Sequence, residues 1–354
     1  MENKFFKTTL LGAAVALASS GVTAKEVGIN SDFSVDVYGV AAMSAVNYNT
    51  TGNGDGTDGY VLENESRIGF RAHKEMFENV LVTMQIESGY VDSWQGGELG
   101  ARDTYLGLSG DWGNLRAGRV LTPMYEIIDW PFSNPGLGSV FDWGGVNGHY
   151  DRQSNQVRYD SPSFGGLTFA VSAGRDGNPS GSATRDSRFF GGNVKYTINT
   201  VTLMGAVEGG SDFRGVSGND NLSYLVGAEV GLPGGFSLAA AYKQETVDIY
   251  TRDADADTGD AGAVGENVEQ GSFSIIGQYW ADSLGFKLGY AANLDAKGIK
   301  TNGSAAEETL DSNTISGQVM YVHNGFVPYV RVAGRTVGDA DTDIVTRVGL
   351  EYGF

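Results

Sequence analysis

Residue types that ordinarily carry out catalysis are sparse and scattered in this sequence of 354 residues. The three histidines, His73, His149 and His323, lie far apart and lack the spacing of metal ligands. There is no cysteine and no Gly-x-Ser-x-Gly motif, which removes thiolate metal sites, disulfides and a nucleophile elbow. The glycine-rich residues 54–59 match a dinucleotide fingerprint by letters, but they open no helix and their acids would repel phosphates. We therefore expect neither an enzyme nor a bound cofactor.

Charged side chains at alternate positions suggest a different chemistry, the electrostatic control of a passage. Between residues 65 and 72, Arg67 and Arg71 share one face and Ile68 and Phe70 the other, because successive side chains of a strand point to opposite faces. Rings of charged side chains set selectivity in pores. The formal net charge of −19 argues against nucleic acid as a partner.

The end of the chain shows the same two-residue period. One face carries the apolar residues Val348, Leu350, Tyr352 and Phe354. The opposite face carries Arg347, Gly349, Glu351 and Gly353, and a strand of a soluble sandwich could show the same pattern. An exposed aromatic row at a free sheet edge invites aggregation, whereas closure of a barrel removes the edge and lipid solvates the rings. We predict that this strand closes an outer-membrane β-barrel against the first strand.

Similar alternating runs recur along the chain, separated by turns rich in Gly, Pro and Asn. We delimit sixteen of them, from residues 33–47 to residues 344–354. An even number of strands of about 10 residues, joined by short turns on one side and long loops on the other, is typical of outer-membrane barrels. At sixteen strands, side chains no longer fill the interior, which leaves an aqueous channel. The predicted fold is therefore all-β, a transmembrane antiparallel barrel.

The N-terminus is typical of a secretory signal peptide. Lys4 and Lys7 form a basic region, residues 10–18 an apolar region and residues 22–24 a small-residue cleavage site. We expect residues 1–24 to be removed and residues 25–354 to form one barrel domain, exported through the periplasm to the outer membrane.

Several local motifs together resemble the general diffusion porins of Gram-negative outer membranes. They are Val37-Tyr38-Gly39, Ser66-Arg67-Ile68-Gly69-Phe70-Arg71, Gly118-Arg119, Val157-Arg158-Tyr159-Asp160-Ser161-Pro162 and the terminal Phe354. The resemblance implies sixteen antiparallel strands, a homotrimer surrounded by outer-membrane lipid and lipopolysaccharide, and a third extracellular loop folded into the barrel.

Residues 121–153 form the longest interruption between runs and are the candidate for that loop. Their many aromatic residues favour an ordered structure, because disordered segments are poor in aromatics. A cap over the barrel mouth is the alternative to insertion into the lumen. If the resemblance holds, Glu126, Asp129 and Asp142 present carboxylates to the channel.

The resemblance also implies a cluster of arginines on the wall opposite these acids. By local motif the cluster comprises Arg67, Arg102, Arg119 and Arg152, and the alternation of residues 65–72 adds Arg71. Tyr38 and Arg158 are expected to face the lumen as well. Opposed rows of charge would create a transverse field that orients dipolar solutes and disfavours apolar ones.

We expect a passive channel for ions and small hydrophilic solutes, weakly selective for cations. One alternative is a sugar-specific porin, which needs a file of aromatic residues in the lumen, and alternation gives only Tyr38 and Tyr329. Another is a surface receptor or adhesion barrel. Asp253, Asp255 and Asp257 have a spacing that could bind Ca²⁺, but the rest of an EF-hand template is missing, which favours a solvated acidic vestibule.

Overall fold

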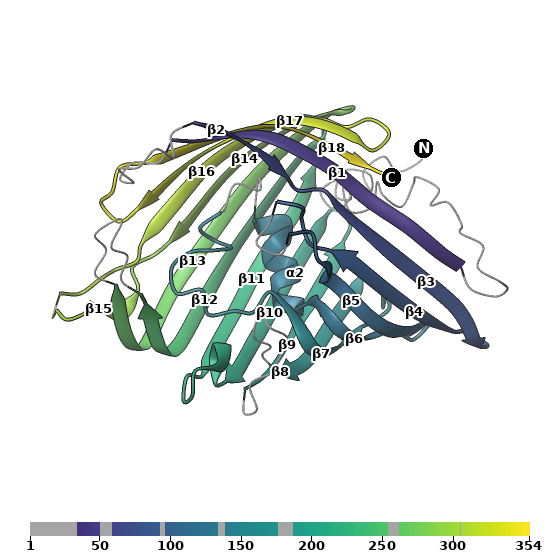
Figure 1. Cartoon of the computed structure of the whole chain (residues 1–354), viewed down its shortest axis with the longest axis horizontal. Coiled ribbons are helices and arrows are strands. Elements are labelled where there is room, and N and C mark those ends of the chain that lie inside the picture. The colour runs from purple at the N-terminus through teal and green to yellow at the C-terminus, as the bar shows by residue number, and fades with distance from the viewer. Residues whose placement is uncertain are drawn as a thin grey trace.

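The computed structural model of the chain describes residues 34–49, 59–92, 96–133, 139–175, 187–253, 262–304 and 306–354. The predicted signal peptide, residues 1–24, lies outside the described residues. Helices are short in the described part of the chain, and none of them is long and apolar enough to cross a membrane. The architecture is a single curved sheet whose first and last strands are paired (Figure 1).

The sheet contains eighteen labelled strands, and all of their pairings are antiparallel. They are β1 (Ser34–Asn49), β2 (Tyr60–Asn64), β3 (Arg67–Phe77), β4 (Val80–Ser88), β5 (Leu99–Gly110), β6 (Gly113–Leu121), β7 (Arg152–Asp160), β8 (Leu167–Arg175), β9 (Arg188–Ile198), β10 (Val201–Ser211), β11 (Asn221–Leu232), β12 (Phe236–Arg252), β13 (Ala263–Ala281), β14 (Leu284–Asn293), β15 (Lys297–Thr301), β16 (Ser312–Tyr321), β17 (Phe326–Val337) and β18 (Asp343–Gly353).

Two of the barrel strands are interrupted, so the eighteen segments make sixteen barrel strands. β2 and β3 pair with successive halves of β1, and the backbone breaks between them at Glu65 and Ser66. The Ser66 hydroxyl accepts a hydrogen bond from the Ala42 amide at 2.9 Å, which keeps the break attached to β1. β14 and β15 pair in the same way with successive parts of β13. The predicted closed sixteen-stranded antiparallel barrel is confirmed.

The closing strand has one exposed apolar face and one buried polar face, as its alternation predicts. Val348, Leu350 and Tyr352 are 51%, 39% and 43% exposed, whereas Arg347 is 6% exposed. The Phe354 amide donates to the Gly39 carbonyl at 3.0 Å, and the Gly39 amide donates back to Phe354 at 2.9 Å. A β-carbon on Gly39 would lie 2.6 Å from the Phe354 ring, so a glycine is required there.

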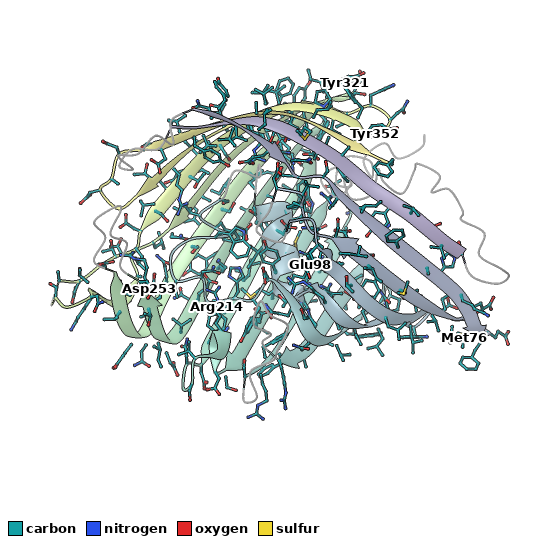
Figure 2. All side chains as sticks on the ribbon, viewed as in Figure 1. Met76, Glu98, Arg214, Asp253, Tyr321 and Tyr352 are labelled. Carbon is teal, nitrogen blue, oxygen red and sulfur yellow. The ribbon has the colours of Figure 1, made fainter. Side chains whose placement is uncertain are left out.

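Short turns lie at one end of the barrel and long connections at the other. Asn79, Asn199, Asp282 and Asn324 lie in four short turns and have positive φ angles of 60°, 54°, 52° and 47°. Asn and Asp tolerate this left-handed conformation better than other non-glycine residues. Figure 2 shows Met76 at the short-turn end and Asp253 at the long-connection end.

Candidate functional site

The connection between β6 and β7 begins with α2 (Pro123–Ile127), followed by the irregular helical turn η2 (Ile128–Phe132). Thr122 caps α2, since its hydroxyl accepts a hydrogen bond from the Tyr125 amide at 3.2 Å, and Pro123 suits the first turn. The Thr122 amide donates to the Asp151 carbonyl at 2.8 Å, which joins the two ends of the connection. Arg152, predicted within this segment, is the first residue of β7.

Polar side chains of the barrel strands bond the backbone of this segment at many points. Ser274 donates to the Phe132 carbonyl at 2.7 Å, and Lys243 donates to the Phe141 carbonyl at 2.8 Å. Further backbone contacts join Pro123 to Asn193, Val140 to Thr314, Val146 to Gln270 and Gly148 to Asn221 and Ser223. Figure 1 draws α2 within the curve of the sheet. The segment is thus fastened to β9, β11, β12, β13 and β16.

Apolar contacts order the segment, as its aromatic content predicts. Met124, Ile127, Ile128, Phe132 and Phe141 are fully buried. They form one cluster with barrel residues such as Leu225, Ala239 and Ala291. Burying apolar surface is worth about 25 cal/mol per Å², so this cluster supplies much of the energy that orders the segment.

A buried ionic group fixes the second half of the segment. The Nδ1 of His149 lies 2.6 Å from Glu245, whose other oxygen lies 3.0 Å from the Lys243 ammonium. All three side chains are at most 1% exposed. Burial and the charge of Lys243 lower the pKa of His149, while Glu245 opposes them. His149 therefore anchors the segment.

Glu126 is ion-paired on both sides. Arg158 of β7 and Lys195 of β9 both donate to its carboxylate, and Arg158 also bonds Asp160 at 2.6 Å. Burial alone would raise the pKa of Glu126, but the charges of Arg158 and Lys195 lower it to about 2. Glu126 therefore ties the segment to the wall and is not a free carboxylate facing Arg67 or Arg102.

The other two predicted acids differ in exposure. Asp142 is 6% exposed and accepts a hydrogen bond from Ser133 at 2.9 Å. Burial raises the pKa of Asp142 to about 7. The side chain of Asp129 is exposed. Desolvation raises the pKa of Asp129, and the positive charges of Arg152 and Arg102 counter only part of this rise.

Neighbouring carboxylates offset part of the positive charge of three of the predicted arginines. Glu87 lies 2.5 Å from Arg102 and 3.8 Å from Arg67, and Asp103 lies 2.5 Å from Arg152. The sequence analysis did not include Asp103 among the site residues. Asp103 lies two positions before Tyr105, so alternation places both side chains on the same face of the strand and could have identified it.

The remaining two predicted arginines bond neutral groups. Arg119 donates to the Ala101 carbonyl at 2.6 Å and to Ser154 at 2.9 Å. Arg71 donates to the Gln85 amide oxygen at 3.1 Å. Hydrogen bonds to neutral groups leave these two positive charges in place, so the charge of the arginine wall is only partly compensated.

Aromatic rings line the same wall, and each lies against a cation. Seven ring–cation pairs occur among the described residues of this wall and segment: Tyr38 with Arg71 (4.0 Å), Tyr329 with Arg331 (3.8 Å), Tyr90 with Arg102 (4.8 Å) and with Arg67 (5.5 Å), Tyr105 with Arg116 (5.5 Å), Trp130 with Lys287 (4.4 Å) and Phe141 with Lys243 (5.2 Å). Alternation identifies only the first two tyrosines. Trp143 adds an indole ring that is 44% exposed and packs against Tyr125 and His149.

No calcium site emerges among the described residues. Asp255 and Asp257 lie outside them, and Asp253 is exposed. No group of three or more potential metal ligands occurs in the part of the chain that the structure describes.

A family model described as Gram-negative porin matches residues 8–283 of the chain. The chain belongs to this family of porins. The porin is 59% identical over 386 aligned positions to the chitoporin of Vibrio furnissii, and the alignment covers 99% of this chain and 100% of that protein. It is 28% identical over 264 positions to a monosaccharide porin of a Halomonas species, covering 68% of this chain and 71% of that protein.

Solved structures show the same fold. The anion-selective porin from Comamonas acidovorans matches with a TM-score of 0.70 and 19% sequence identity, covering 91% of this chain and 100% of that chain. The porin is therefore an outer-membrane protein of a family of channels, and its relatives are not enzymes.

Proposed function

We propose that the porin is a water-filled channel for passive diffusion of small hydrophilic solutes, and that oligosaccharides of N-acetylated amino sugars are its preferred substrates. One observation carries the substrate class, the 59% identity to a chitoporin over nearly the full length of both proteins. Chitin oligosaccharides are uncharged and rich in hydroxyl and amide groups.

The chemistry of the wall suits such a substrate. Glu87 and Asp103 pair with three of the five predicted arginines, so the wall offers hydrogen-bond donors and acceptors, and part of its positive charge is offset. The exposed ring of Trp143 and the partly exposed ring of Trp130 offer apolar faces beside polar groups. Ligand sites typically combine such faces with a few placed polar groups.

The proposal includes a constriction. The segment of residues 121–153 folds into the lumen and narrows it, with Asp129 opposite Arg102 and Arg152. Its support is the series of hydrogen bonds from inward-facing side chains, including Ser274 and Lys243.

Ion selectivity is weak and favours cations. Glu87 and Asp103 offset part of the positive charge of the wall, whereas the whole chain carries a formal charge of −19, with acids concentrated in the long connections. Charges at a mouth concentrate counter-ions within a Debye length of ~8 Å at physiological salt. Selectivity should therefore fall as salt rises.

Planar-bilayer recordings test the substrate. Addition of N-acetylglucosamine hexamer should produce brief, concentration-dependent interruptions of the current. Maltohexaose, an uncharged oligomer of similar length without acetamido groups, serves as the control and should produce far fewer. Equal interruption by both sugars, or none by either, would favour a general diffusion channel.

A further inference from the structure

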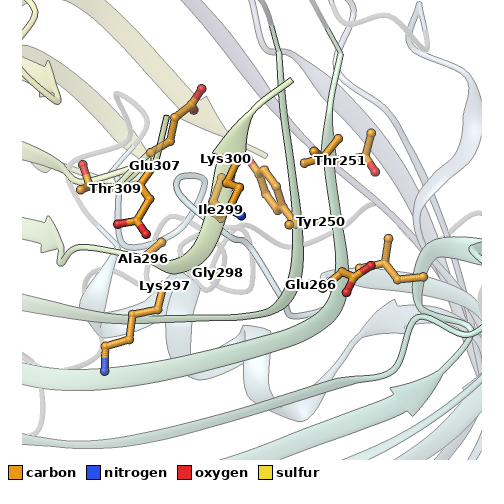
Figure 3. Close-up of a pocket in the computed structure, with 14 residues that line it drawn as sticks. Tyr250, Thr251, Glu266, Ala296, Lys297, Gly298, Ile299, Lys300, Glu307 and Thr309 are labelled. Carbon is orange, nitrogen blue, oxygen red and sulfur yellow. The ribbon is translucent and has the colours of Figure 1, made fainter. Parts of the chain in front are cut away.

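A pocket lies at the long-connection end of the barrel, outside the segment of residues 121–153. It has a volume of about 830 Å³ and is lined by the ends of β12 and β13, by β15 and by residues 307–309 (Figure 3). Pockets for small molecules usually measure about 300–1,000 Å³. This pocket is therefore large enough for a short oligosaccharide.

A glycine lets three strands pack closely beneath the pocket. Gly265 of β13 pairs with Tyr250 of β12 on one side and with Ile299 of β15 on the other. A β-carbon on Gly265 would lie 3.2 Å from Ile299 and 2.5 Å from Val268, so no side chain fits at this position. Tyr250 and Ile299 line the pocket on either side of Gly265 and provide an aromatic and aliphatic floor (Figure 3).

The floor is continuous with the anchor of the 121–153 segment. Ile299 and Ala296 belong to the same apolar cluster as Val146 and Tyr150, and Tyr250 packs against that cluster. A ligand on this floor would lie against the group of residues that holds the end of that segment.

The rim carries opposite charges that cancel. Its carboxylates are Glu266, Glu307 and Glu308, and its ammonium groups are Lys297 and Lys300. Glu308 is paired with Arg252 at 3.0 Å, which supplies a third cation. A rim with many donors and acceptors but no excess charge suits an uncharged polar ligand better than an ion.

We propose that this pocket is an external capture site for uncharged N-acetylated oligosaccharides, which it holds at the mouth before they enter the channel. The inference rests on the proposed function, because it assigns the same substrate class to a second site. Tyr250 offers a ring face, and the exposed Lys300 and Glu307, which face each other in an isolated bridge, offer a donor and an acceptor.

The double substitution Glu307→Ala/Lys300→Ala tests the site. It removes the acceptor and the donor, and because it removes one charge of each sign, the net charge of the mouth stays the same. Two lost hydrogen bonds at about 0.5–1.5 kcal/mol each correspond to roughly a tenfold fall in capture. A matched control, Glu98→Ala/Arg188→Ala, changes two exposed residues at the same end of the barrel outside the pocket.

Trapping of N-acetylglucosamine hexamer is recorded with the sugar on either side of the membrane. We expect the association rate from the long-connection side to fall about tenfold in the double variant, with the rate from the other side and the open conductance unchanged. Equal rates in the variant and the wild type, or an equal fall from both sides, would overturn the capture site alone. Absence of trapping in the wild type from both sides would overturn the proposed function as well.

Discussion

The carboxylate of Glu87 accepts a hydrogen bond from Arg102 at 2.5 Å. The same side chain accepts the Tyr38 hydroxyl at 2.7 Å and lies 3.8 Å from Arg67, while only 7% of Glu87 is exposed. One buried acid therefore lies between two of the predicted wall arginines and offsets one of their two positive charges. Its charge determines how positive this side of the channel is.

Substitution Glu87→Gln should shift the channel toward anions. A unit charge at 4 Å contributes about 1 kcal/mol in water, which corresponds to about a fivefold change in the local concentration of a monovalent ion. Reversal potentials in a salt gradient measure the shift. Glu98→Gln, at an exposed position, is the control. An identical reversal potential for Glu87→Gln and the wild type would show that this wall does not set selectivity.

The contacts of Glu126 should weaken in acid. Its pKa is about 2 in the folded protein against an ordinary value of 4.5, because Arg158 and Lys195 outweigh burial. A lowered carboxyl pKa stabilises the fold above pH 4.5, and that contribution is lost as the pH falls toward 2. We expect closing events in bilayer recordings to become about tenfold more frequent across that window. This change corresponds to a loss of ~1.4 kcal/mol of the free energy that holds the segment in place.

The variant Glu126→Gln separates this effect from the titration of other acids. It should show frequent closing events already at pH 6 and a weaker dependence on acid than the wild type. If both proteins respond to acid alike, Glu126 does not hold the segment.

Gly69 provides the space for the Tyr38 ring. A β-carbon on Gly69 would lie 2.3 Å from that ring, on which Arg71 stacks at 4.0 Å. Gly69→Ala should therefore displace both side chains and destabilise the barrel by about 1–3 kcal/mol. The temperature at which the folded band disappears on a gel measures this loss.

Gly277→Ala is the matched control for that substitution. Gly277 is also a strand glycine, and its β-carbon would meet no atom within 4 Å. We expect Gly277→Ala to leave the transition temperature near that of the wild type. Similar losses in the two variants would trace the effect to glycine itself and not to Tyr38.

The outer face of β1 is the proposed trimer contact. Ala41 and Met43 are exposed on it, and the small side chains of Ala41 and Ala45 keep this part of it flat, which suits close packing of protein more than lipid. Ala41→Arg should weaken the oligomer, because a charged side chain does not fit a close apolar contact. Mild-detergent electrophoresis with stepwise heating compares the bands. A trimer band as heat-resistant as that of the wild type would place the interface elsewhere.

The sequence predicts the faces of the strands better than the neighbours of each side chain. Alternation predicts that Arg67, Arg71 and Tyr38 face inward, because it needs no knowledge of the partner strand. Alternation could not predict the pairing of Arg102 with Glu87. The ladder between β4 and β5 shifts register between Ile86 and Ser88, and such a bulge re-aims the residues beside it.

The positions of side chains in the connections between strands are harder still to predict from the sequence. Tyr90 follows β4 and Trp130 lies in η2, where no two-residue period applies, so neither could be counted among the rings of the channel. The aromatic residues of the 121–153 segment indicated order without indicating which strands they contact. Only the fold brings Phe132 to Ser274 and Phe141 to Lys243.

The bonds of the 121–153 segment also have a mechanical consequence. The segment leaves β6, returns through β7 and is bonded to strands as far around the barrel as Thr314 of β16. A wide hollow cylinder flattens easily under lateral load unless something spans it. Here one segment joins distant parts of the wall, so the residues that we propose to narrow the pore would also stiffen its cross-section against the lateral pressure of the bilayer.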